Sequence, residues 1–415
     1  MKVRRKMRSK AKSAAGGRRK KKIKRAGLDD LPEWMKDKRC PRKRRYLSGQ
    51  RILPPAITGK ENLSDLLKNS FLAYNSARLK EGSRLFTEKI LKPNVTVGMT
   101  LAGALTPAGL GVSCIVPLIK AGFVDWIVTT GANIYHDLHF ALNKPLYAGT
   151  PNVNDADLRS NEIVRIYDIF IDYKKTLIKT DRLLCKILLQ PEFRKEMGTA
   201  EFHYLLGKYA AMMEEKNRQK DVSVLAAAYR AKVPIYTSAP GDSTIGMDIA
   251  GLELEGLKLR INPSIDVNET AAIVLNAKKK KGKSGIILIG GGSPKNFILQ
   301  TEPHIQEILF LKDVGHDYFF QITDARPDTG GLSGATPREA VSWGKINPKE
   351  LPNAVVCYID STIALPIITH YAFANHKKRP LKKLYSKRDK MMKYLKQIYF
   401  KYNERIDVNR KWSVR

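Results

Sequence analysis

The sequence predicts an α/β fold with a doubly wound, mostly parallel sheet covered by helices on both faces. From about residue 95 onward, short β-branched runs alternate with helical patterns, the order typical of parallel strands joined by crossover helices. Most of the runs are apolar on both faces, as strands between two helical layers are. With 415 residues, 43% of them hydrophobic, the chain can bury a core of that size.

Six strands and seven helices are expected along the chain. The strands span residues 95–99, 124–129, 235–238, 286–289, 318–322 and 355–359. The helical patterns span residues 163–189, 200–215, 222–231, 269–279, 305–312, 337–343 and 362–373. The lysine run 278–281 ends one of these helices. We expect it to face water, because a helix C-terminus favours positive charge.

Positive charge is concentrated at the two ends of the chain. Of a formal net charge of +34, residues 1–45 carry +17 and residues 377–415 carry +12, which leaves +5 for residues 46–376. These boundaries predict a disordered basic arm, a folded domain and a basic, amphipathic C-terminal helix. The arm could contact nucleic acid or anionic lipid nonspecifically through counterion release, or it could be a solubility tail.

No segment of the sequence predicts a membrane span. Residues 93–119 carry no charge, but four glycines and three prolines among them favour a strand, loop and helix. The arm has no apolar region of the secretory type, although organelle targeting stays open. The four cysteines are far apart with no CxxC spacing, so a reducing cytoplasm is the expected location.

Three predicted strands end in residues suited to ligand binding. In parallel sheets, ligands bind beyond the carboxyl ends of the strands. Residues 128–133 (VTTGAN), 290–292 (GGG) and 356–361 (VCYIDS) occupy such positions. None of them is GxGxxG, and tight packing between strand and helix explains a glycine run as well. Asp360 could hold ribose hydroxyls, or it could cap the helix that follows.

One motif resembles a known family. Residues 339–345 read EAVSWGK, which matches the signature of deoxyhypusine synthases, whose catalytic lysine follows Glu-Ala-Val-Ser-Trp-Gly. The resemblance extends over about residues 50–375, through VDWIVTT at 124–130, PGDS at 240–243 and ILIGGG at 287–292. It implies a Rossmann-like NAD site in a catalytic domain at 46–376. It also implies a homotetramer with cofactor sites at subunit interfaces.

The chemistry that this resemblance implies moves the 4-aminobutyl group of spermidine to an amine acceptor. An amine is a poor leaving group at carbon, and oxidation of the C–N bond by NAD makes that carbon electrophilic. A neutral lysine can then hold the fragment as an imine. Taken alone, Lys345 and Glu339 would be read as surface charges and Trp343 as a core residue. With the match, Trp343 could lower the lysine pKa and Glu339 could bind a polyamine.

The resemblance assigns roles position by position. Lys345 corresponds to the catalytic lysine. The positions that correspond to substrate contacts are Glu339, Trp343, Tyr135, His136, Asn296 and Gly291. The positions that correspond to NAD contacts are Gly103, Ala104, Leu105, Thr106, Pro107, Thr130, Gly131, Ala132, Asp242, Asp324, Ala325, Asp360 and Ser361. No metal is expected, because the sequence has neither HExxH nor zinc-ligand spacing.

Departures from the protein-modifying enzymes leave the acceptor open. Tyr135 and His136 replace an acidic pair, Asn296 replaces a histidine, and Leu332 replaces an acid. Residues 106–111, 292–297 and 331–336 resemble the microbial deoxyhypusine synthase-like branch, some members of which make homospermidine. Putrescine is therefore slightly favoured over a protein lysine. Other readings are a nucleic-acid-binding protein that uses its basic termini, and a different NAD enzyme on the same architecture.

Overall fold

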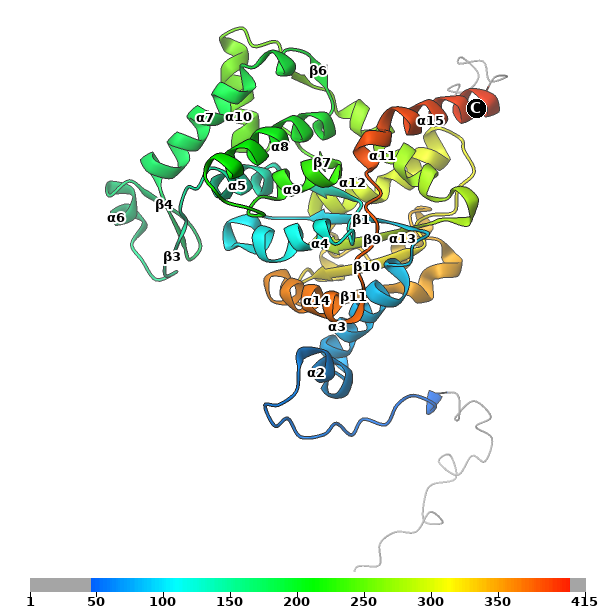
Figure 1. Ribbon diagram of the computed structural model, residues 1–415. Coiled ribbons are helices and arrows are strands. Elements are labelled where there is room, and N and C mark those ends of the chain that lie inside the picture. Colours follow the sequence, from blue (N-terminus) through cyan, green and yellow to red (C-terminus); the bar gives the residue numbers. More distant parts are fainter. Residues whose placement is uncertain (1–45, 404–415) are drawn as a thin grey trace, which may run out of the picture. The chain divides into compact units, whose positions relative to one another are not determined.

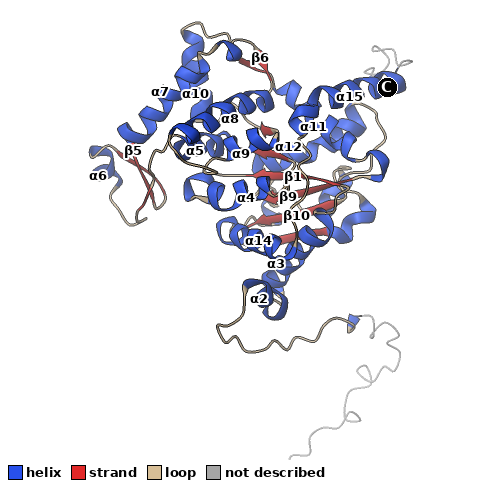
Figure 2. Ribbon diagram, in the orientation of Figure 1, coloured by secondary structure: helices blue, strands red, loops and turns tan. Residues whose placement is uncertain are grey.

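A parallel sheet of six strands forms the centre of the computed structural model, which describes residues 46–403 (Figures 1 and 2). The predicted disordered arm at 1–45 lies outside the described residues. Residues 46–53 form a unit of their own and are exposed, and the sheet belongs to the unit that begins at Pro54. In spatial order the strands are β11 (Ala354–Tyr358), β10 (Tyr318–Thr323), β9 (Lys283–Ile289), β1 (Val95–Leu101), β2 (Trp126–Thr129) and β7 (Ile235–Thr237).

The strand order reverses between β1 and β9. The chain runs outward from β1 through β2 to β7, then returns to the other side of β1 and runs outward again from β9 through β10 to β11. All five strand pairs are parallel. This is the order of a doubly wound dinucleotide-binding sheet, in which the ligand lies at the reversal, beyond the carboxyl ends of the strands.

Both faces of the sheet are covered, as predicted. Alternate residues of β9 show this, since Ile287 and Ile289 belong to one buried cluster and Ile286 and Leu288 to the other. The first cluster includes residues of α3 (Tyr74–Leu85), α4 (Val116–Lys120), α5 (Gly131–Ala141), α9 (Val224–Ala231) and α14 (Ser361–Asn375). The second includes residues of α11 (Pro263–Ala277), α12 (Gly292–Pro303), α13 (Pro337–Ser342) and α15 (Arg388–Asn403).

The other elements surround this framework. The helices are α2 (Leu63–Ser70), α6 (Asp155–Ser160), α7 (Lys179–Leu188), α8 (Thr199–Lys216) and α10 (Thr244–Leu254). Short strands pair in two small sheets, which consist of β3 (Tyr147–Ala148), β4 (Ile163–Ile166) and β5 (Ile169–Asp172), and of β6 (Glu196–Met197) and β8 (Arg260–Ile261). Among the described helices, none is long and apolar enough to cross a membrane.

Two helix predictions are wrong. Residues 163–172 form the β4–β5 hairpin, and only α7 matches the second half of the predicted helix at 163–189. The hairpin sequence IVRIYDIFID is rich in β-branched and aromatic residues, which favour strands. In the second case the helix lies earlier than predicted. Instead of spanning 305–312, it runs as α12 from residue 292 and closes with a π-helical turn, His304–Ile308.

The basic C-terminal helix is α15, and it lies against α11 (Figure 1). Its apolar residues Met391 and Leu395 are buried. The segment that leads to it is anchored at the start of β1, where Arg379 and Lys382 donate to the carbonyl of Val95. There, Arg379 forms an ion pair of 3.0 Å with the buried Asp125, which also accepts a hydrogen bond of 2.8 Å from the backbone N–H of Val97. The described part of the extension, residues 377–403, thus belongs to the same compact unit as the sheet.

Candidate active site

Lys345 stands on a tightly fixed turn at the end of α13. Thr336 is the N-cap of the helix, and its hydroxyl accepts from the backbone N–H of Glu339, while Trp343 is the C-cap. Gly344 then adopts a left-handed conformation with φ of 64°. The N–H of Gly344 donates to the carbonyl of Val341, and that of Lys345 to the carbonyl of Ala340, each at 3.0 Å. These are the two hydrogen bonds of a Schellman motif, and they explain the glycine before the lysine.

The side chain of Lys345 points into a cavity of about 270 Å³. Its Nζ donates to Oδ1 of Asn296 at 3.2 Å and lies 5.5 Å from the ring centroid of Trp343. The lining brings together four of the predicted site residues, from α12, α13 and the turn after α13. The full lining is Lys295, Asn296, Leu299, Gln300, Phe319, Leu332, Ala335, Glu339, Ala340, Trp343 and Lys345.

Burial shifts both lysines of the cavity toward the neutral amine. Desolvation lowers the pKa of Lys345, and the carboxylates of Glu339 and Glu307 oppose this. Lys295 is 2% exposed, and burial lowers its pKa to about 8. Its ammonium donates to the carbonyls of Ser333 and Ala335 at 3.1 and 2.7 Å. A neutral carbonyl oxygen stabilises an ammonium less than a carboxylate would. Both amines therefore lose their proton, and can act as nucleophiles, more readily than the amine of a surface lysine.

A separate group of predicted residues lies at the carboxyl ends of β1, β2 and β7. Thr130 caps α5 and donates from its hydroxyl to the carbonyl of Gly103 at 2.6 Å. Oδ1 of Asn133 accepts from the N–H groups of Leu105 and Thr106, at 2.7 and 3.2 Å. A Cβ on Gly131 would lie 2.4 Å from the hydroxyl of Ser243. The chain segments at 103–107, at 130–132 and around Asp242 are therefore joined into one surface.

The remaining predicted NAD positions follow β10 and β11. Asp324 is exposed, and the N–H of Ala325 donates to the hydroxyl of Thr323 at 3.1 Å. Asp360 caps α14 by accepting from the N–H groups of Thr362 and Ile363, at 2.8 and 3.2 Å. The capping role considered for Asp360 is thus present. Its side chain remains exposed, so capping leaves room for contact with a ligand as well.

Gly291 has a clear packing role at the end of β9. A Cβ at this position would lie 2.4 Å from the Cα of Ser333, so only glycine allows the loop 331–335 to approach so closely. The contact is fastened by the N–H of Gly292, which donates to the Ser333 hydroxyl at 2.8 Å. The glycine run therefore positions the loop that forms one wall of the Lys345 cavity.

Tyr135 and His136 lie on α5 and are not among the residues that line the Lys345 cavity. The hydroxyl of Tyr135 donates to Oδ1 of Asp181 at 2.5 Å, and the ring of His136 contacts that of His139 at 3.2 Å between Nδ1 and Nε2. Burial lowers the pKa of His136 to about 4, so this histidine is neutral near pH 7. Within one chain these two positions belong to a different cluster from Lys345.

Several residues of the site were missed by the sequence reasoning. Lys295 and Gln300 line the cavity, and Asn133 organises the loop after β1. Lys295 lies in the first turn of the helix after the glycine run, so its position could have been noticed. The roles of Gln300 and Asn133 depend on side-chain contacts in the folded chain, which the sequence around these residues does not reveal.

The chain is similar in sequence to known proteins over most of its length. The family model described as "Deoxyhypusine synthase" matches residues 64–372. A "Deoxyhypusine synthase-like protein" of Nostoc punctiforme is 55% identical over 351 residues, covering 85% of this chain and 90% of that protein. A protein of the same name from Thermosynechococcus vestitus is 55% identical, covering 84% and 87%. "Probable deoxyhypusine synthase 2" of Methanosarcina acetivorans is 39% identical over 315 residues, covering 75% and 85%.

Proposed function

The chain belongs to the deoxyhypusine synthase family, and on this premise we propose that it transfers the 4-aminobutyl group of spermidine to an amine acceptor with NAD as cofactor. Membership of the family implies an enzyme of the aminobutyl transferase class. The observation that carries the proposal is the amine of Lys345, whose pKa burial lowers, in a cavity beside an indole ring and the carboxylate of Glu339.

The residues at the carboxyl edge of the sheet suit a dinucleotide. The strand order reverses there, and α5 begins directly after β2, where the N-terminus of a helix can stabilise a phosphate. Gly103 has φ of 64°, and a Cβ built on it would have no atom within 4 Å, so open space adjoins this turn. Gly103 to Pro107, Thr130 to Ala132, Asp242, Asp324, Ala325, Asp360 and Ser361 would hold the cofactor. NAD would supply one chemistry, the uptake and later return of a hydride.

The remaining steps fall to side chains of the cavity. The carboxylate of Glu339 binds a cationic nitrogen of spermidine, and the Trp343 face contacts the alkyl chain. Once the C–N bond is oxidised, the neutral amine of Lys345 adds to the carbon and displaces 1,3-diaminopropane, leaving the four-carbon fragment as an imine on Nζ. The acceptor amine then adds to that carbon and displaces Lys345. This displacement leaves an imine between the fragment and the acceptor, which the hydride held by NAD would reduce to a C–N single bond.

Putrescine is the acceptor that we propose. Among the residues that line the cavity, Glu339 is the one carboxylate, and Leu332, with 51% of its surface exposed, occupies a position where protein-modifying enzymes carry an acid. The cavity is small and lined by few charges, which suits a short diamine. A lysine of the hypusine-carrying translation factor is the alternative acceptor.

Mass spectrometry of reaction mixtures tests both the proposed reaction and the proposed acceptor. Purified protein incubated with spermidine and NAD should release 1,3-diaminopropane, and addition of putrescine should yield homospermidine. Adding the translation factor in place of putrescine should leave that protein's mass unchanged. A modified translation factor would reverse the choice of acceptor, and the absence of diaminopropane under every condition would remove the proposed reaction.

We also propose that a second subunit completes the site in a homotetramer. Support comes from the lining of the Lys345 cavity, which includes none of the proposed cofactor positions. Coexpression of Lys345→Arg with Asp242→Ala should therefore restore activity that each variant lacks alone, because a mixed interface combines one intact lysine with one intact cofactor surface. If the mixture stays as inactive as either variant, the two parts work within one chain.

A further inference from the structure

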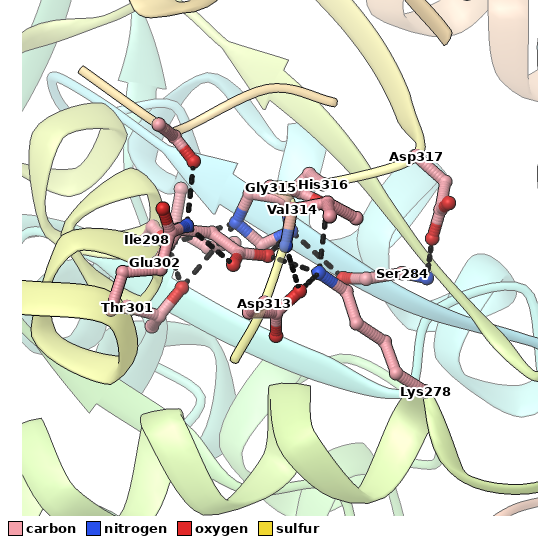
Figure 3. A network of polar contacts seen from close by, with 12 residues as sticks. Lys278, Ser284, Ile298, Thr301, Glu302, Asp313, Val314, Gly315, His316 and Asp317 are labelled. Atoms are coloured by element: carbon pink, nitrogen blue, oxygen red, sulfur yellow. Dashed lines mark hydrogen bonds and ion pairs between the residues drawn. The ribbon is translucent and has the colours of Figure 1, made fainter. Parts of the chain in front are cut away.

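A buried polar network (Figure 3) is joined by hydrogen bonds to the backbone of the Lys345 turn. Its centre is the ammonium of Lys278, which donates to Oε1 of Glu302 at 2.7 Å, to Oδ1 of Asp313 and to the carbonyl of Gly315 at 2.7 Å. The predicted exposure of the lysine run is thus wrong for Lys278, whose side chain is only 16% exposed. All three protons of the ammonium have acceptors, two of which are carboxylates.

One arm of the network reaches the backbone carbonyl just before the catalytic lysine. Gln306, on the π-helical turn that follows α12, donates from Nε2 to the carbonyl of Gly344 at 2.9 Å. The same Nε2 lies 3.5 Å from Oε2 of Glu302, whose other oxygen binds Lys278. A Cβ on Gly344 would lie 2.5 Å from Oε1 of Gln306, so the glutamine amide packs directly against this glycine and a side chain there would displace it.

The second arm fixes the carbonyl of Lys345 itself. Lys278 binds Gly315, and the next residue, His316, donates its backbone N–H to the carbonyl of Lys345 at 2.9 Å. The N–H of Asn347 returns a hydrogen bond of 3.0 Å to the carbonyl of His316. The imidazole of His316 is fully buried and contacts the hydroxyl of Ser284 at 2.8 Å, which anchors this arm to β9.

From these contacts we infer that Lys278, Glu302 and Gln306 are positioning residues, and that Gln306 holds the Gly344–Lys345 peptide so that the Lys345 amine faces Asn296 inside the cavity. None of the three lines the cavity. They act through the two carbonyls that bracket Lys345. The inference rests on the proposed function, since it concerns the nucleophile of that reaction. A displacement of about 1 Å at a reacting atom is enough to slow a reaction about 100-fold.

Gln306→Met is the informative variant, because it removes the amide that holds Gly344 but leaves the Lys278–Glu302–Asp313 contacts in place. We expect kcat for diaminopropane release to fall about 10- to 100-fold, with KM for spermidine within about twofold of wild type. Gln219→Met is the matched control. Its amide contacts Asn143 in a loop remote in sequence from the turn, and it should match wild type in both constants.

A second readout does not need turnover. The pH dependence of reductive methylation of Lys345, followed by peptide mass spectrometry, reports when its amine becomes neutral. The charged groups around that amine, Glu339, Glu307 and Lys295, are unchanged in Gln306→Met. The midpoint should therefore move toward the ordinary lysine value only if the turn leaves the cavity.

The outcomes separate the two proposals. If wild type releases no diaminopropane, the proposed reaction fails, while the methylation midpoint still decides the positioning role. If wild type is active and Gln306→Met equals Gln219→Met in kcat and in midpoint, the positioning role is overturned. A rise in KM with unchanged kcat also overturns it, because that pattern marks a binding contact.

Discussion

The regions around Lys278 and Lys345 bury lysines in opposite ways. Burial opposes the charge of Lys278, but the carboxylates of Glu302 and Asp313 outweigh it and raise the pKa of this lysine. Lys345 has the amide oxygen of Asn296 as its hydrogen-bond partner, and burial lowers its pKa. The difference shows that burial alone does not make a lysine reactive. The partner of the ammonium decides whether the side chain stays charged or becomes a nucleophile.

The two regions are also connected. The ammonium of Lys278, at the end of α11, donates to the carbonyl of Gly315, and the next residue donates its N–H to the carbonyl of Lys345. Both lysines also contact α12, Lys278 through Glu302 and Lys345 through Asn296. We interpret Lys278 as part of the support for Lys345, the lysine whose pKa burial lowers.

Lys345→Arg should lower the release of 1,3-diaminopropane by at least about 1000-fold, because a guanidinium stays protonated and cannot form the imine. Product formation measured by chromatography checks this. The same change should leave the thermal midpoint close to that of wild type, since Lys345 forms no ion pair within the described residues. Turnover near the wild-type rate would place the nucleophile elsewhere.

Lys278→Met should lower the free energy of unfolding by about 3–5 kcal/mol, because Glu302 and Asp313 are left buried without their cation. Urea denaturation followed by circular dichroism measures the loss. Lys281→Met, three residues along the same run, removes an exposed charge and should change stability by less than about 0.5 kcal/mol. Equal effects of the two changes would show that the contacts of Lys278 with Glu302 and Asp313 add nothing to the free energy of unfolding.

Glu339→Gln should move the acidic limb of the kcat/KM profile to lower pH. The carboxylate of Glu339 raises the pKa of Lys345, so its removal lowers that pKa and the neutral amine persists to lower pH. KM for spermidine should rise at the same time. Glu307→Gln should shift the limb in the same direction with KM unchanged, because Glu307 does not line the cavity. A shift to higher pH in either variant would contradict the assignment.

The sheet was predictable because its strands are apolar on both faces, and this pattern can be recognised in the sequence without knowing which strands are neighbours. Each of the six predicted strands covers more than half of the observed one, and β7 was placed within one residue. The hairpin at 163–172 was missed because its apolar residues also fit a helical period when the β-branched content is ignored. The early end of α12 depends on Pro303 and the π-helical turn after it, which periodicity does not reveal.

The candidate site was predictable where a contiguous motif carries it. Glu339, Trp343 and Lys345 lie within seven residues, and the structure places them around one cavity with Asn296. Lys278 was misjudged because its two carboxylate partners lie 24 and 35 residues further along the chain. A run of four lysines is usually solvated, and only the fold shows that the first of them turns inward.

Trapping of the proposed intermediate tests the central claim most directly. Wild-type protein incubated with spermidine and NAD, then reduced with borohydride and digested, should yield a four-carbon amine adduct on the peptide that contains Lys345. Lys295, although buried in the same cavity, should remain unmodified. An adduct on Lys295 or on another lysine, or no adduct while diaminopropane is being released, would contradict the account.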